Sequence, residues 1–215
     1  VSNLQHHLQD IYELNIPHNV NDFLITSHAL ADELDSENQK SNLKEKLLLR
    51  QDDGELSLSL YLHTDVVEKM LEDDPVQNLH EGNMQDFCLA LEGVSHFLYL
   101  SWNASFDRSV TMLEMELQAE IDKFVMLVLC LEKQNRRAEP GKLRQILFET
   151  ANYHKELGES ERQRYRDASY FAEKYCWQLE SDYLNNRGRQ QLLQELRQFY
   201  RLTQMDKLSR INRPN

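Results

Sequence analysis

Four glutamates and one histidine that could form a site lie within the most apolar part of the chain, which spans residues 84–133. Glu92 and His96 are four positions apart, as are Glu116 and Glu120, so each pair shares one face of a helix. Two helices that each present a pair of carboxylate or imidazole groups can hold a metal ion inside a bundle. Bundle sites of this kind use Glu-x-x-His spacing, which this sequence lacks, so a hydrogen-bonded or solvated polar face is the simpler interpretation. The candidate polar cluster consists of Glu92, His96, Glu114, Glu116 and Glu120.

The same residues are suited to acid–base chemistry. Glu92 can hold His96 in one tautomer and leave the other ring nitrogen as a base. A nucleophile is not apparent, because Ser95 and Ser101 lack the Gly-x-Ser-x-Gly context of a strand–turn–helix nucleophile. A glycine-rich phosphate loop and a Walker-type lysine are also absent from the sequence. The motifs therefore favour a protein that is not an enzyme, and they predict no cofactor.

A cationic helix is expected after Ser160, where basic and aromatic residues are interleaved. Such a mixture can stack on bases and neutralise phosphates. Acidic residues are interspersed, however, and the formal net charge of the whole chain is −12, which opposes binding to a polyanion. Nucleic-acid binding is therefore an alternative hypothesis, and a surface for a protein partner is another. The residues concerned are Arg162, Arg164, Arg166 and Lys174.

Two central helices must position the candidate polar cluster. Apolar residues recur at steps of three and four over residues 87–102 and again over residues 113–128, which predicts one helix for each. We expect a break at residues 103–107 and a start of the second helix near residues 108–109. Gly93 lies inside the first helix at a cost of about 1 kcal/mol relative to Ala, and it can let a neighbouring segment approach closely. The two helices should pack together as the core.

The clearest β signal precedes these helices. Leucine alternates with other residues over positions 56–63, which predicts a strand with one buried face. Residues 46–51 are its expected partner across a turn at residues 52–54, and residues 23–26 are a candidate third strand. A two-stranded hairpin is marginal in water, so its leucine face should pack on helices. The predicted fold is α+β and predominantly α-helical: a helical bundle with a small antiparallel β-hairpin or three-stranded sheet near the N-terminus.

Charge divides the chain into two parts. Residues 1–134 carry 8 Lys/Arg and 25 Asp/Glu, a net charge of −17 (8 less 25), whereas residues 135–215 carry 16 and 11, a net charge of +5 (16 less 11). We predict one continuous domain: an acidic α+β part with the hairpin at 46–62 and the helix pair at 84–133, and a C-terminal helical part packed on it. Opposite charge can hold the two parts together, or it can form a basic surface for an acidic partner.

The C-terminal part should contain three helices, at residues 143–157, 160–184 and 192–200, with capping boxes predicted at Asp65 and Ser160 for two helices of the chain. The polar tail from Asp206 onwards is expected to be loosely held. The sequence has no apolar stretch long enough for a membrane span and no signal-peptide pattern, which favours a cytoplasmic protein with no membrane contact.

The leading functional hypothesis is a non-enzymatic protein-interaction or scaffold protein, with another protein or a second copy of the chain as its partner. The alternatives are a metal-binding or acid–base site at the candidate polar cluster, and nucleic-acid binding through the helix after Ser160.

Overall fold

The computed structural model describes residues 1–35, 43–52, 55–149, 158–185 and 188–213. These residues are mostly helical, with a small three-stranded sheet near the N-terminus, which confirms the predicted α+β class. The turn predicted at residues 52–54 and the end of the helix predicted at 143–157 fall partly outside the described residues.

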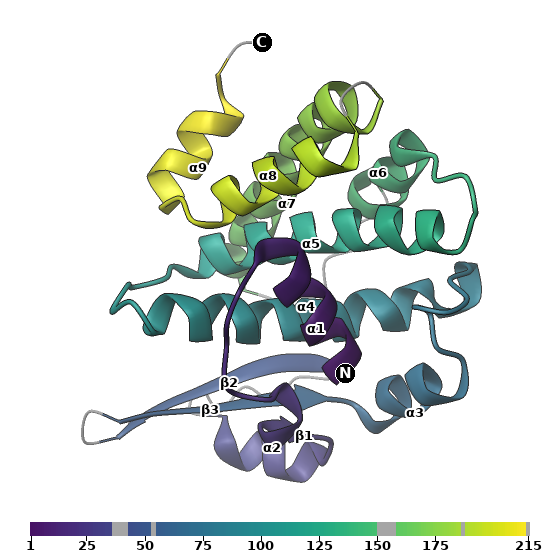
Figure 1. Cartoon of the computed structure of the whole chain (residues 1–215). Coiled ribbons are helices and arrows are strands. Elements are labelled where there is room, and N and C mark those ends of the chain that lie inside the picture. The colour runs from purple at the N-terminus through teal and green to yellow at the C-terminus, as the bar shows by residue number, and fades with distance from the viewer. Residues whose placement is uncertain (36–42, 53–54, 150–157, 186–187, 214–215) are drawn as a thin grey trace.

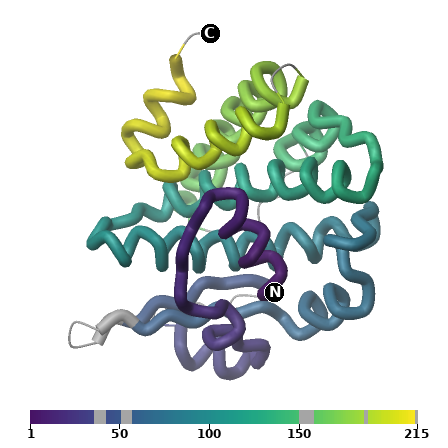
Figure 2. Tube along the Cα trace, viewed as in Figure 1, coloured from purple at the N-terminus to yellow at the C-terminus, as the bar shows by residue number. Residues whose placement is uncertain are grey.

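Four layers are stacked in the order sheet, α4, α5, α7 (Figure 1). Helices α4 (Glu81–Ala104) and α5 (Met112–Lys133) are the two central layers, and α7 (Glu159–Leu179) covers the side of α5 that faces away from α4. Figure 2 traces the chain from the sheet, through the two central helices, to the C-terminal helices on the far side. The flanking helices are α1 (Ser2–Tyr12), α2 (His28–Leu34), α3 (Thr64–Glu72), α6 (Pro140–Glu149), α8 (Arg189–Tyr200) and α9 (Gln204–Ile211), with short helical segments at Val20–Asp22 and Glu180–Leu184.

The central helix pair is confirmed, with one shift at the start of its second helix. Residues 93–99 of α4 are all buried, and so are residues 114–130 of α5 apart from Glu120. Helix α5 begins at Met112 rather than at residues 108–109. The N-cap of this helix is Thr111, whose Oγ1 accepts the backbone N–H of Glu114 at 3.1 Å.

The sheet contains β1 (Leu24–Ile25), β2 (Glu45–Asp52) and β3 (Glu55–Leu62) in the order β1–β3–β2. Strands β2 and β3 form the predicted antiparallel hairpin, with Lys46 opposite Tyr61. The expected third strand is present but runs parallel to β3, with Leu24 opposite Leu60. Leu60 and Leu62 are fully buried and belong to the same apolar core as α4, so the leucine face packs on helices as predicted.

Helices α3 and α7 are capped at earlier residues than the sequence predicts. The cap of α3 is His63, whose Nδ1 accepts the backbone N–H of Asp65, instead of a box beginning at Asp65. The cap of α7 is Gly158, whose N–H donates to the carboxylate of Glu161, instead of a box beginning at Ser160. In both cases the capping residue lies two positions earlier: the His63 ring accepts a free N–H of the helix start, and at α7 the Glu161 carboxylate accepts the N–H of Gly158.

The expectation of a loosely held tail is wrong for residues 206–211. They belong to α9, which begins after Thr203, and Lys207 and Ile211 are fully buried on one side of this helix. Two ion pairs join the oppositely charged parts of the chain, Arg164 to Glu116 and Arg197 to Glu13. Among the helices of the described residues, none is both long enough and apolar enough to cross a membrane.

Gly93 is the point where the sheet meets α4. A Cβ atom at this position would lie 2.6 Å from Leu60 Cδ1 and 3.1 Å from Glu45 Oε1. The close neighbours are therefore side chains of β3 and β2.

Replacing this glycine is a direct test of the close approach. We expect Gly93→Ala to lower the free energy of unfolding by about 1 kcal/mol, because overpacking costs about 1–3 kcal/mol and the gain in helix propensity recovers about 1 kcal/mol. Urea unfolding followed by circular dichroism measures the change. A stabilisation of about 1 kcal/mol, the propensity gain alone, would show that the space beside Gly93 is open.

Candidate functional site

Three of the five predicted cluster residues come together between α4 and α5. Glu92, His96 and Glu116 each offer one possible ligand atom, and these atoms all lie within 4.8 Å of one another. Glu120 is connected to them only through a shared lysine, and Glu114 lies in a different cluster. The structure thus brings together Glu92 and His96, which the i, i+4 spacing puts on one helix face. The five residues do not form one site.

His96 lies between two carboxylates. Its Nε2 is 3.5 Å from Glu116 Oε2 on α5, and its Nδ1 is 3.7 Å from Glu45 Oε1 on β2. Both separations are longer than a normal N–H···O hydrogen bond. His96 is only 5% exposed, and neither its Nε2 nor Glu45 Oε1 has a hydrogen-bond partner among the described residues.

The protonation of His96 is controlled by these neighbours. Burial alone lowers the pKa of His96, but the negative charges of Glu116 and Glu45 outweigh it and raise the pKa well above the usual histidine value. Burial also raises the pKa of Glu45, against the opposing effect of His96. The imidazole therefore acts as the counter-charge of two buried carboxylates when no other cation is present.

A lysine joins the remaining two carboxylates. Lys123 Nζ lies 2.5 Å from Glu92 Oε2 and 2.9 Å from Glu120 Oε1. Burial lowers the pKa of Lys123, but Glu120 and Glu92 outweigh it and raise the pKa well above the usual lysine value. Burial raises the pKa of Glu120, and Lys123 opposes that shift. This lysine is a permanent cation of the site.

The fourth layer contributes a second permanent cation. Arg164 of α7 has its Nε 3.9 Å from Glu116 Oε1, too far for a hydrogen bond. The cluster thus crosses every layer of the fold, from β2 through α4 and α5 to α7. Four carboxylates and two permanent cations face His96 and one another, and they are Glu45, Glu92, Glu116, Glu120, Lys123 and Arg164.

The structure does not have the geometry that the acid–base hypothesis expects at His96. The carboxylates at the His96 ring nitrogens are Glu45 and Glu116, whereas Glu92 is bound to Lys123. The hydroxyl of the adjacent Ser95 donates to Asp122 at 2.6 Å, so its base partner in the structure is Asp122 and not His96.

Glu114 belongs to a second buried cluster around a lysine of α9. Lys207 Nζ donates to Tyr99 Oη at 3.0 Å and to Gln118 Oε1 at 2.8 Å, and Tyr99 in turn donates to Glu114 at 2.8 Å. The amine also lies 4.4 Å from the centre of the Tyr99 ring. In the described part of the chain, Lys207 forms no ion pair with a carboxylate. Burial lowers the pKa of Lys207 to about 7, against the raising effect of Glu114 and Asp122.

The other end of this second cluster is a buried carboxylate. Asp122 accepts hydrogen bonds from Ser95, from Gln118 at 2.9 Å and from the Tyr12 hydroxyl of α1. Burial raises the pKa of Asp122 to about 6, and the hydrogen bonds from Ser95 and Tyr12 oppose the shift. Since its groups are hydrogen-bonded to one another, the cluster explains how α1 and α9 are fixed to the central pair.

The four cations of the helix after Ser160 all have partners within the chain. Arg162 and Arg166 both pair with Glu159, and Lys174 donates to Asn212 of the segment after α9. Arg164 pairs with Glu116 and with Glu161. Nucleic-acid binding through these residues is an untested hypothesis, and the pairing argues against it because a paired cation contributes less to phosphate binding.

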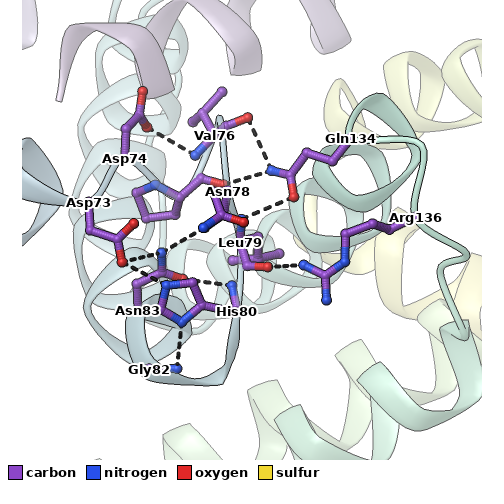
Figure 3. Close-up of polar contacts among 11 residues, drawn as sticks. Asp73, Asp74, Val76, Asn78, Leu79, His80, Gly82, Asn83, Gln134 and Arg136 are labelled. Atoms are coloured by element: carbon purple, nitrogen blue, oxygen red, sulfur yellow. Dashed lines mark hydrogen bonds and ion pairs between the residues drawn. The ribbon is translucent and has the colours of Figure 1, made fainter.

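The loop between α3 and α4 is a further polar network, shown in Figure 3. Gln134 at the end of α5 accepts the N–H of Leu79 and donates to the carbonyl groups of Pro75 and Val76. At the start of α4, His80 Nδ1 accepts the N–H of Gly82, while its Nε2 lies 2.7 Å from Asp73. A cavity of about 250 Å³ lies beside this corner. The polar groups of this loop are hydrogen-bonded to one another, so we interpret the loop as structural.

Comparison with known proteins gives no match: no family model, no curated protein and no solved structure is significantly similar to this chain. The function can therefore be inferred only from the geometry of the chain's own residues.

Lys123 and Lys142 each lie three residues after a glutamate, but Lys123 is buried and Lys142 is exposed, so the two provide a matched test of the cluster around His96. We expect Lys123→Met to lower the free energy of unfolding by about 3 kcal/mol or more, because it leaves Glu92 and Glu120 without their cation. The control is Lys142→Met, which removes a lysine with the same i, i+3 spacing to Glu139 at an exposed position and should change little. Urea unfolding measures both variants, and equal effects would contradict the assigned role of Lys123.

The second cluster predicts an unusual pH dependence. Because the pKa of Lys207 is lower in the folded chain, the unfolded chain binds more protons between about pH 7 and pH 10. This group therefore increases the free energy of unfolding by about 1.4 kcal/mol per pH unit as the pH rises through that range. Below about pH 7 the folded lysine is charged as well, and its destabilising effect is complete.

Lys207→Met should remove this contribution. The difference in stability between wild type and variant should change by about 1.4 kcal/mol between pH 7.5 and pH 8.5, in favour of the wild type at the higher pH. Urea titrations at the two pH values measure it, and Lys174→Met, at a half-buried position of α7, is the control. A difference that is the same at both pH values would show that Lys207 keeps an ordinary pKa.

Proposed function

We propose that the protein is a non-enzymatic metal protein that binds one divalent transition-metal ion between α4 and α5, through His96, Glu116 and Glu92. The observation that carries the proposal is the buried Nε2 of His96, which has no hydrogen-bond partner among the described residues and lies 3.5 Å from Glu116 Oε2. Two atoms bound to one tetrahedral ion are about 3.4 Å apart when each is about 2.1 Å from the metal. The spacing thus suits a shared ion better than a direct hydrogen bond.

The charge of the cluster supports a divalent cation. Glu45, Glu92, Glu116 and Glu120 face Lys123 and Arg164, and Arg164 also lies 3.9 Å from Glu161, so the carboxylates outnumber the permanent cations when His96 is neutral. A divalent ion offsets two of these negative charges. One imidazole together with carboxylates is a ligand set that suits zinc or manganese, whereas calcium and magnesium prefer oxygen ligands alone.

Burial supports a structural role for the ion. Catalytic zinc sites keep one coordination position open to substrate, whereas structural sites are closed. The side chains of His96 and Glu116 are 6% and 5% exposed, and the cavity beside α3 is lined by neither of them. A closed site between two central helices serves the stability of the fold.

The interaction role expected from the sequence is compatible with a structural metal and stays a prediction. Tyr170 and Trp177 are large exposed side chains that lie seven positions apart, on one face of α7. Another protein or a second copy of the chain as partner, and a cytoplasmic location, are likewise still predictions.

Calorimetry tests the metal site directly. Full-length protein treated with a chelator and then titrated with Zn²⁺ should bind one ion per chain. His96→Ala and Glu116→Gln should each weaken binding by at least about tenfold, since the loss of an outer-shell partner alone costs about 10–100-fold. Elemental analysis of the purified protein is the second measurement.

The matched control for this test is Glu114→Gln. Glu114 is a buried carboxylate of the same helix, but it belongs to the Lys207 cluster, and a glutamine can still accept the hydrogen bond from Tyr99. Zinc affinity should therefore stay within about twofold of the wild type, since no ligand or outer-shell partner is lost. If the wild type binds no zinc, or if all three variants bind it equally, the residues form an ion network and not a metal site.

A further inference from the structure

Glu45 is the residue by which the sheet reaches the candidate metal site. It is the first residue of β2 and lies opposite Leu62 in the hairpin. Its side chain is 9% exposed and points toward α4, where Gly93 leaves room for it: a Cβ at Gly93 would be 3.1 Å from Glu45 Oε1. Glu45 thus enters the interior beside Gly93, where the helix lacks a side chain.

One oxygen of the Glu45 carboxylate lacks a hydrogen bond. Its Oε1 has no hydrogen-bond partner among the described residues, and Nδ1 of His96 is 3.7 Å away. A buried carboxylate oxygen that accepts no hydrogen bond is costly, so such a position calls for a role. A histidine that binds a metal through one ring nitrogen almost always donates the N–H of the other nitrogen to a carboxylate, a backbone carbonyl or water. Glu45 faces the nitrogen that would carry that N–H.

We propose that Glu45 is the positioning residue of the metal site, and that metal binding clamps the β2–β3 hairpin onto α4; the inference rests on the metal-binding function proposed above. A metal on Nε2 leaves the proton of the imidazole on Nδ1, which faces Glu45. The ring then links α5 on one side to the hairpin on the other. Because coupling between two events is reciprocal, a hairpin held against α4 also favours metal binding.

Hydrogen exchange of the hairpin tests the clamp without reference to any activity. With Zn²⁺ bound, the backbone amides of β2 and β3 should exchange at least several-fold more slowly in the wild type. Glu45→Leu should bind Zn²⁺ about 10–100-fold more weakly, and at zinc concentrations that saturate it the hairpin should show no added protection. Glu45→Gln, which keeps an acceptor of the same shape but no charge, should fall between the two. His96→Ala controls for zinc bound elsewhere and should show no zinc-dependent protection.

The outcomes separate this inference from the proposed function. Slower exchange in the wild type that is lost in Glu45→Leu supports the clamp. If Zn²⁺ binds the wild type and Glu45→Leu equally, or if the hairpin exchanges at the same rate with and without zinc, the clamp is wrong while the metal site stands. If the wild type binds no zinc, both fail. Circular dichroism of the metal-free variants establishes that each is folded, and Glu45→Gln provides the test if Glu45→Leu is not.

Discussion

Helix α4 is covered on both sides, by the sheet and by α5, and its ionisable groups must find their counter-charges inside the protein. A charge that leaves water without a partner costs more than the few kcal/mol by which a domain is stable. Residues 93–99 are all buried, so His96 has no route to solvent. The positions of Glu45, Glu116, Lys123 and Arg164 follow from this constraint, since each lies where it offsets another buried charge.

The two buried clusters meet the constraint in different ways. Around Lys207 the groups are hydrogen-bonded in a continuous chain, and a lowered lysine pKa reduces the charge that must be buried. Around His96 the charges are retained, with carboxylates and cations from four layers in one place. One cluster therefore fixes α1 and α9 to the core by hydrogen bonds, while the other joins the sheet to α7 by charge.

Sequence spacing was sufficient to predict the central helix pair and the hairpin, but it predicted only part of the site. The helix pair and the hairpin follow from unbroken periodic patterns, and the i, i+4 spacing correctly placed Glu92 and His96 on one face. No local pattern relates Glu45 to His96, because they come from a strand and a helix far apart in the chain. Two signals were available and missed: Lys123 lies directly before the apolar run at residues 124–131, and Thr203 with Asp206 has the spacing of a capping box for α9.

The distances within the His96 cluster separate a metal site from a network that only balances charge. Lys123 shows what a completed ion pair looks like in this interior, with contacts of 2.5 Å and 2.9 Å to its two carboxylates. His96 lies in the same surroundings and carries carboxylates on both sides, yet both remain beyond hydrogen-bond distance. If charge balance alone determined the arrangement, the imidazole would be expected to approach Glu116 as closely as the lysine approaches Glu92. The separation of 3.5 Å between His96 Nε2 and Glu116 Oε2 suits two ligand atoms around a shared ion, and for this reason we propose the metal at His96 and not at Lys123.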